Sequence, residues 1–163
     1  AWIAFNALYG RVDDQNRAWG DREAWETFLA MIWRVDHEGC LRRLLCRRQL
    51  PVLRLIENRF LYDRFWLNPR VNYDHQLSEK VRELMLRFGK HNMLPILNEL
   101  FDRIYIMRLQ VFHGATTKGS SLNRRTLNGC AALITEFLPA MIDIMIRNGT
   151  ETDWGRVCFP PIA

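Results

Sequence analysis

The chain has 163 residues, a formal net charge of +5 and a sequence pI of about 9.3. Apolar residues make up 48% of it and charged residues 25%, a composition that is typical of one folded globular domain and excludes a disordered chain. No run of about 18 uninterrupted apolar residues is present, so we expect no transmembrane helix. No basic start followed by a short apolar core indicates a signal peptide.

The sequence begins AWIAFNALYG, without an initiator Met and already in an amphipathic register. We therefore expect residues 1–163 to form a single helical domain that is a fragment or is incomplete at its N-terminus.

The positive net charge favours polyanionic partners. Nearly all the basic residues are arginines, which suit phosphate recognition, although GC-rich codon usage explains the same excess equally well.

Helix signals dominate the first half of the chain. Residues 2–9 predict an apolar helix that stops at Gly10. Asp21 is the expected N-cap of a helix over residues 22–38, which Gly39 should end. A short helix over residues 40–50 carries four arginines on its polar side, and Pro51 then fits the first turn of a helix over residues 52–66. The arginines are Arg42, Arg43, Arg47 and Arg48.

The second half follows the same pattern. Residues 67–75 are expected to be a loop, and a helix over residues 76–88 should end at Gly89. Pro95 suits the first turn of the next helix, and a polar loop separates that helix from a last one over residues 123–148. The tail contains a Pro-Pro pair and is expected to form a non-helical strap. No period-two pattern is present, so the sequence predicts an all-α helical bundle.

Cysteine usage gives little support to a metal site. Cys40, Cys46, Cys130 and Cys158 lack paired metal-ligand spacing, and we expect reduced, buried thiols in a cytoplasmic protein. A zinc site made by His37 with Cys40 and Cys46 is the weaker alternative. No phosphate-binding loop, HExxH motif or GxSxG elbow is present. We therefore expect no metal and no cofactor.

One charge interrupts the apolar face of the helix that begins near Pro95. Arg108 projects near the middle of that face when each residue advances about 100°. A charge in this position must be paired, solvated by a cavity or placed at an interface, because burying it alone is prohibitive. The apolar residues of the face are Leu97, Leu100, Phe101, Ile104, Tyr105, Val111 and Phe112.

His113 follows Arg108 by five positions, about 140° further around the same helix. The two side chains do not meet on one uninterrupted helical face. Gly114 is a natural C-terminal cap, so His113 should lie in the last turn or just beyond it. The spacing therefore permits a local site or a composite site across a two-fold axis. The alternative is an Arg that extends to solvent or pairs with a carboxylate, beside a histidine that only ends a helix.

The Arg-x4-His-Gly pattern at residues 108–114, with WIAFNALYG at the start and DWG followed by FPPI at the tail, resembles the Apea-like branch of the HEPN superfamily. The resemblance covers essentially the whole chain. It implies an all-α bundle that dimerises and acts as a metal-independent endoribonuclease, often in prokaryotic defence or toxin systems. By this resemblance, Arg108 would hold the scissile phosphate and His113 would serve as general acid or base. RNA would be cut to 2′,3′-cyclic phosphate and 5′-hydroxyl ends, whereas DNA would not be cut.

One position departs from the family pattern. A polar residue, commonly Asn, usually follows the Arg, but here Leu109 does. Gln110 is retained, and Asn6, in an otherwise apolar helix, is the next candidate for substrate binding, with a buried amide bonded to backbone as the alternative. Lys118 follows the His-Gly turn and is a candidate for phosphate or ribose contact, or a plain solvated loop residue. Thr116 and Asn123 share those two interpretations.

Three functions stay open at this point. The first is a homodimeric HEPN ribonuclease that cleaves RNA, with an antitoxin or an additional domain as a further partner and no membrane partner. The second is a non-catalytic HEPN module that binds nucleotide, RNA or a protein. The third is a purely structural bundle in which Arg108 pairs with a carboxylate. The cluster of arginines in residues 40–50 is either an RNA-binding surface or a solvated helix face.

Overall fold

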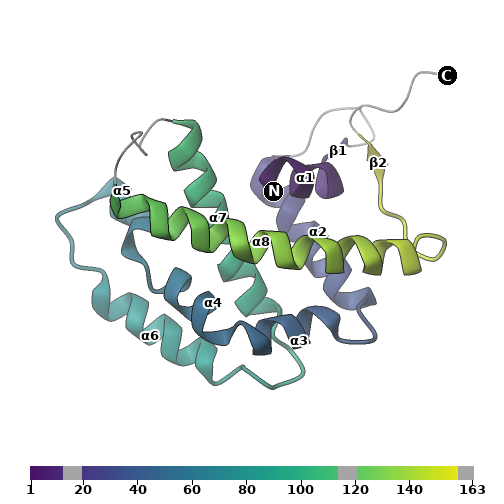
Figure 1. Ribbon diagram of the computed structural model, residues 1–163, viewed down its shortest axis with the longest axis horizontal. Coiled ribbons are helices and arrows are strands. Elements are labelled where there is room, and N and C mark those ends of the chain that lie inside the picture. Colours follow the sequence, from purple (N-terminus) through teal and green to yellow (C-terminus); the bar gives the residue numbers. More distant parts are fainter. Residues whose placement is uncertain (13–19, 114–120, 158–163) are drawn as a thin grey trace.

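The computed structural model describes residues 1–12, 20–113 and 121–157, and its helices confirm the predicted all-α class. Helix α7 (Leu94–Phe112) packs against α2 (Asp21–Val35), α4 (Gln49–Ile56) and α8 (Ser121–Arg147). Figure 1 shows α8 crossing in front of α7 along the long axis of the molecule. Helix α7 therefore forms the centre of the bundle, and its two ends lie on different sides.

The remaining elements surround this centre. Helix α1 packs on α2 and α8, and α3 packs on α8 and α4. Two short helices follow α4, and α6 lies along the lower edge in Figure 1. Their bounds are α1 (Trp2–Tyr9), α3 (Cys40–Arg47), η1 (Arg59–Leu61), α5 (Asp63–Leu67) and α6 (Asp74–Met85).

Aromatic rings join four helices in the core. The ring of Phe5 in α1 lies 4.7 Å from the ring of Phe101 in α7 and 5.9 Å from that of Phe28 in α2. Phe101 also meets Phe137 of α8 at 6.2 Å, edge to face. All four side chains are buried. Each such pair stabilises a fold by about 0.5–1.5 kcal/mol beyond its buried area, so α1 is fastened to the centre of the bundle.

Helix α2 ends earlier than the sequence pattern suggests. It stops at Val35 rather than near residue 38. The carboxylate of Asp36 accepts hydrogen bonds from the backbone N–H groups of Cys40 and Leu41, each at 2.8 Å. A side chain that caps the next helix competes with continuation of the first. Gly39 has φ 67° and is the N-cap of α3 rather than the end of α2.

The single helix expected over residues 52–66 is wrong, because the chain forms three shorter elements there. Helix α4 ends at Ile56 with Pro51 in its first turn, as the sequence predicts for this proline. The side chain of Asn58 then accepts a hydrogen bond from the backbone N–H of Phe60 at 3.0 Å, which starts the 3-10 helix η1. Helix α5 follows after Tyr62.

A short strand pair ties the two ends of the described chain together. Strand β1 (Arg11–Val12) pairs antiparallel with β2 (Arg156–Val157). Two residues are too few to show the alternating pattern by which strands are predicted. The tail leaves the helical state after α8, in agreement with the expected strap, but its Pro-Pro pair lies outside the described residues.

Helix α8 is long and apolar enough over Arg124–Arg147 to meet the length and hydropathy of a membrane span. This stretch contains Glu136 and Asp143, and one side of it packs into the core through Leu133 and Phe137. The core therefore buries one side of α8, whereas other apolar side chains of this helix are exposed, with Ile146 at an exposed fraction of 74%.

The described cysteines are free, but they differ in burial. Cys130 in α8 is buried, Cys40 is half-buried and Cys46 is exposed. The expectation of buried thiols therefore holds for Cys130 and is wrong for Cys46. Cys158 lies outside the described residues.

Candidate functional site

Arg108 lies on α7 and reaches across to α2. Its Nη1 atom is 3.0 Å from Oδ2 of Asp21. The guanidinium stacks 4.9 Å from the ring centre of Phe112 and 5.7 Å from that of Tyr105. The exposed fractions of the two charged side chains are 28% and 30%. The charge in the apolar face is therefore paired at the edge of the bundle and remains in contact with solvent.

The carboxylate of Asp21 is held from two sides. The hydroxyl of Tyr9 in α1 donates a hydrogen bond of 2.6 Å to its Oδ1 atom, while Arg108 binds its Oδ2 atom. Burial raises the pKa of Tyr9, and the hydrogen bond to Asp21 raises it further, so the phenol stays protonated as a donor. This carboxylate connects α1, α2 and α7.

The predicted capping role of Asp21 is wrong. Gly20 occupies the N-cap of α2, no side chain caps it, and Asp21 is the first helical residue. Its position in the first turn is still favourable, because negative charge is stabilised near a helix N-terminus. The sequence contains a signal for an acidic first turn but none for the partner, which is 87 residues away.

His113 lies where α7 ends. It is the C-cap residue, with φ −92° and ψ 11°, and its backbone N–H donates to the carbonyl of Leu109 at 2.9 Å. Its side chain is exposed. This agrees with the expected position in the last turn, and the following Gly114 lies outside the described residues. No hydrogen bond joins Arg108 to His113 within the described part of the chain.

Of the three candidate substrate-binding residues, the two that the structure describes form no hydrogen bond with Arg108. Gln110 is buried, and its Nε2 atom donates to the backbone carbonyl of Phe60 in η1, which places it on another side of α7. Asn6 is exposed on α1, so the alternative of a buried amide does not hold. Among the described residues its side chain forms no hydrogen bond with the predicted catalytic pair. Lys118 lies outside the described residues, as does Thr116.

An apolar cavity of about 220 Å³ borders Arg108 between α1, α7 and α8. Trp2, Phe112 and Leu127 contribute to its wall. The Nε atom of Arg108 and the Nε1 atom of Trp2 are buried, and neither has a hydrogen-bond partner among the described residues. The surroundings of Arg108 therefore combine a paired charge, two unused donors and an apolar surface.

A second cavity, of about 550 Å³, contains a charge network that the sequence pattern did not reveal. Arg103 of α7 has an exposed side-chain fraction of only 3%, and it pairs with Asp102 at 2.7 Å and with Glu99 at 3.3 Å. Arg22 pairs with Asp102 at 2.6 Å, and Lys80 with Glu99 at 2.9 Å. Burial raises the pKa of Asp102, although both arginines oppose this. Each of these cations is neutralised by a carboxylate.

The arginines of residues 40–50 differ in their contacts. Arg48 is paired with Glu136 of α8, with Nε 2.7 Å from Oε2. Arg43 donates to the backbone carbonyl of Glu38. Arg42 borders a separate cavity with His37. Because Glu136 neutralises Arg48, an RNA-binding surface made by all four arginines is disfavoured, whereas Arg42, Arg43 and Arg47 are exposed on α3.

The zinc alternative finds no support in the described part of the chain. No group of three or more His, Cys, Asp or Glu side chains there could hold a metal ion.

No family model, no curated protein and no solved structure matches this chain.

Proposed function

We propose that the chain is a metal-independent endoribonuclease of the HEPN type, with Arg108 and His113 as its catalytic pair. One observation supports this most directly. The side chain of Arg108 is held at the edge of the bundle by Asp21, and the same helix ends at an exposed His113. The pairing leaves the Nη2 atom of Arg108 without a hydrogen bond among the described residues. The net charge of +5 favours a polyanionic substrate.

The proposed reaction uses a hydroxyl group of the RNA itself. The 2′-oxygen loses its proton to a general base and bonds to phosphorus, while the bond to the 5′-oxygen breaks and that oxygen gains a proton. His113 transfers one of these protons. The guanidinium of Arg108 stabilises the negative charge on the non-bridging phosphate oxygens. The products are a 2′,3′-cyclic phosphate and a 5′-hydroxyl end.

A cleavage assay with EDTA present tests this proposal. Total RNA and tRNA are incubated with the wild-type chain, with His113→Ala and with the control His75→Ala, which alters another exposed histidine, in α6. Removal of a general acid or base lowers rates by about 10²–10⁴. We expect cleavage by the wild type and the control, and its loss in His113→Ala with unchanged helical circular dichroism.

Two results would contradict the assignment. One is full cleavage by His113→Ala, and the other is equal loss in both variants. Product ends identify the reaction, because metal-dependent hydrolysis would leave no cyclic phosphate.

A non-catalytic module that binds nucleotide, RNA or a protein is the second candidate. Leu109 favours it, because an apolar side chain stands where the resembled family carries a polar one. This candidate predicts RNA binding without strand scission and loss of binding in Arg108→Ala. Filter binding and gel analysis of the same samples separate the two functions, since any strand scission that depends on His113 excludes the non-catalytic module.

A further inference from the structure

A cavity of about 240 Å³ lies where α2 ends and α3 begins, and the loop before α7 closes it. Its lining includes two arginines, Arg34 and Arg42, and two histidines, His37 and His91. This concentration of basic side chains differs from the network around Arg103, where each cation has a carboxylate partner.

The acidic side chain in this lining is already engaged. Asp36 accepts the backbone N–H groups of Cys40 and Leu41, one on each carboxylate oxygen, both at 2.8 Å. Neither Arg34 nor Arg42 forms an ion pair within the described part of the chain. Two guanidinium groups therefore face the cavity without a counter-charge of their own.

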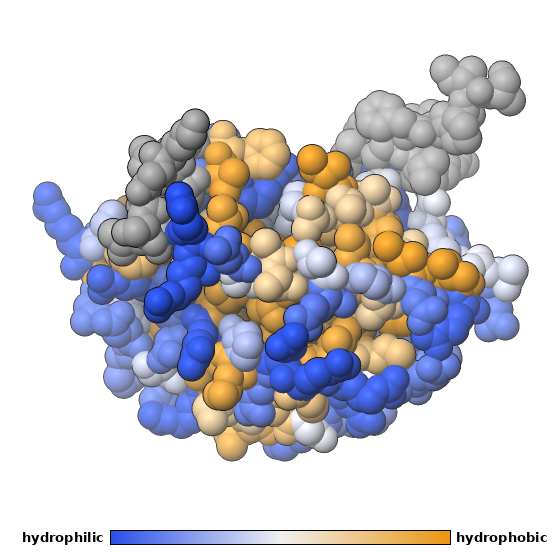
Figure 2. Space-filling view, viewed as in Figure 1, coloured by the Kyte–Doolittle hydropathy of each residue, from blue (hydrophilic) through white to orange (hydrophobic). Residues whose placement is uncertain are grey.

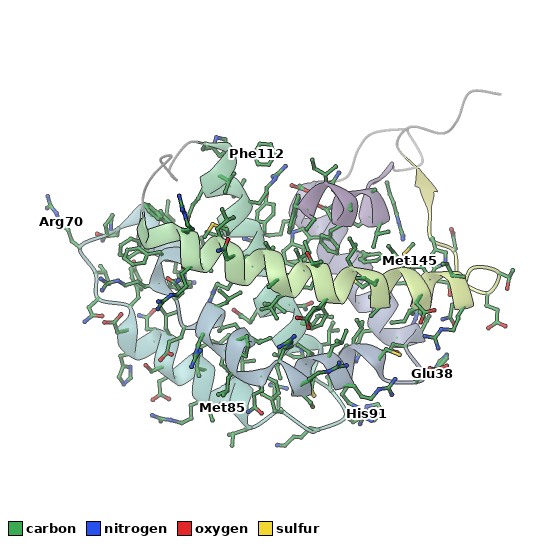
Figure 3. All side chains as sticks on the ribbon, viewed as in Figure 1. Glu38, Arg70, Met85, His91, Phe112 and Met145 are labelled. Atoms are coloured by element: carbon green, nitrogen blue, oxygen red, sulfur yellow. The ribbon has the colours of Figure 1, made fainter. Side chains whose placement is uncertain are left out.

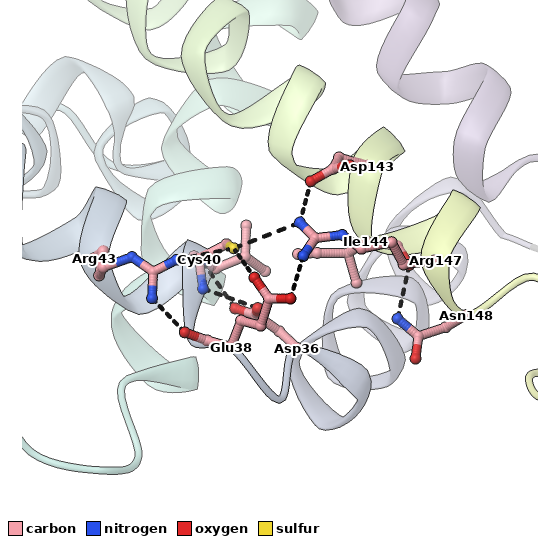
Figure 4. Close-up of polar contacts among 9 residues, drawn as sticks. Asp36, Glu38, Cys40, Arg43, Asp143, Ile144, Arg147 and Asn148 are labelled. Carbon is pink, nitrogen blue, oxygen red and sulfur yellow. Dashed lines mark hydrogen bonds and ion pairs between the residues drawn. The ribbon is translucent and has the colours of Figure 1, made fainter.

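The nearby carboxylate of Glu38 does not supply that counter-charge. It pairs with Arg147 of α8, which is also bonded to Asp143 (Figure 4). The hydrogen bond from Arg147 lowers the pKa of Glu38, so the carboxylate stays ionised in this pair. Glu38 is thus engaged by Arg147 in a network outside the lining of the cavity.

The side chain of Arg42 lies close to the start of α3. Helix α3 begins at the cavity wall, with Gly39 as its N-cap in the left-handed region. A Cβ atom at Gly39 would lie 3.4 Å from the Nε atom of Arg42, so the Arg42 side chain folds back over the start of its own helix. Since Asp36 already accepts the first N–H groups of α3, the attraction for a phosphate group comes from the guanidinium fork of Arg42 and not from the helix N-terminus.

We propose that this cavity binds the phosphate group of a nucleotide or of an RNA strand through Arg34, Arg42 and the two histidines. Trp33 also lines the cavity and gives an adjoining base an aromatic surface. The site is separate from the proposed catalytic pair. His91 precedes α7 and His113 ends it, and a helix of 19 residues spans about 27 Å between its first and last Cα atoms. Figure 3 shows His91 and Phe112 at opposite edges of the molecule.

Isothermal titration calorimetry of the whole chain tests the proposal. The ligands are inorganic phosphate, AMP and a short 2′-O-methyl RNA, which cannot be cut by attack of a 2′-hydroxyl. The variants are Arg42→Gln and Arg34→Gln, and the matched control is Arg47→Gln, which alters another exposed arginine of α3 outside the cavity. We expect binding to weaken about tenfold or more in each cavity variant and to stay unchanged in the control.

The ligands identify the source of the phosphate. Binding of AMP or phosphate indicates a free nucleotide site, whereas binding of the RNA alone indicates contact with a strand. The proposal fails if the wild type binds none of the three, or if Arg47→Gln loses as much affinity as the cavity variants. If one of the two cavity variants loses affinity because it folds incorrectly, the other still tests the role of the cavity. Since no ligand is cleaved, the outcome does not depend on ribonuclease activity.

Discussion

Two arginines of α7 have opposite environments. Arg103 is almost fully buried, and besides its two carboxylate partners it donates from Nε to the carbonyl of Ile56 at 3.2 Å. Arg108 has a single ion pair at the edge of the bundle. The apolar pattern drew attention only to Arg108. The two arginines of α7 therefore differ in burial and in the number of their carboxylate partners.

This difference predicts unequal losses of stability. Arg103→Ala takes one of two cationic partners from Asp102 and from Glu99 and leaves the carbonyl of Ile56 without its donor, and we expect the free energy of unfolding to fall by about 3 kcal/mol. Arg108→Ala removes a solvent-screened pair, and we expect a loss of about 1 kcal/mol or less. Urea unfolding followed by circular dichroism measures both values, with the exposed Arg54→Ala as control.

A loss in Arg108→Ala as large as that in Arg103→Ala would contradict the proposed function. In that case the ion pair with Asp21 would be structural, and the third interpretation of the sequence would be correct.

At the scale of elements, helices with strong apolar spacing and a terminal Gly or Pro were predictable. Helix α1 ends before Gly10, and α7 carries Pro95 in its first turn, both as expected. The predicted helix boundaries that are wrong depend on side chains that form hydrogen bonds with the nearby backbone. Asp36 caps α3, and Asn58 starts η1. The periodicity of apolar residues along the sequence contains no information about such side-chain to backbone bonds.

The candidate site was predictable only in part. Arg108 was found because it breaks the apolar face, and the position of His113 followed from the helix end. Asp21 and Tyr9 could not be found in this way, because they reach Arg108 only through packing of α1 and α2 on α7. Gln110 was assigned to the substrate, whereas in the structure its side-chain nitrogen is bonded to the carbonyl of Phe60. The spacing of apolar residues predicts which side of a helix is buried, but it does not predict which other element packs against that side.

The docking of α8 can be tested through Cys130. Helix α8 packs on α4 so closely at Gly129 that an added Cβ atom would lie 3.6 Å from the Cδ2 atom of Leu55. Burial raises the pKa of the adjacent Cys130 to about 12. Only the thiolate reacts with iodoacetamide, and at a pH far below that value very little thiolate forms. We expect Cys130 to be labelled far more slowly than the exposed Cys46, and labelling should increase as the pH rises toward the pKa.

Peptide mass spectrometry after timed labelling near pH 8 measures both rates in one sample. Urea supplies the control, since unfolding should make Cys130 as reactive as Cys46. Equal labelling of the two thiols in the native chain would mean that α8 does not pack as described.

At the scale of the whole molecule, one edge is apolar although the chain is basic. Phe112 has an exposed fraction of 67%, and Val111, Leu127 and Phe112 all border the cavity beside Arg108. Figure 2 shows apolar surface at the upper end of α7 and over α1. Exposed apolar patches often mark interaction sites. The proposed homodimer would use this edge and bring a second copy of the catalytic pair close to the first.

Phe112→Glu should therefore convert a dimer into a monomer, because a carboxylate buried at an apolar interface is costly. The control is Leu67→Glu, which changes a more exposed apolar residue, on α5 and outside the lining of this cavity. Sedimentation velocity of the wild type and both variants gives the oligomeric state. A monomeric wild type, or dissociation by Leu67→Glu alone, would exclude this interface.

A mixture of two inactive variants, Arg108→Ala and His113→Ala, tests whether each site uses residues of both copies. If it does, the heterodimers contain one complete site and cleavage is restored. If each site lies within one chain, the mixture stays inactive.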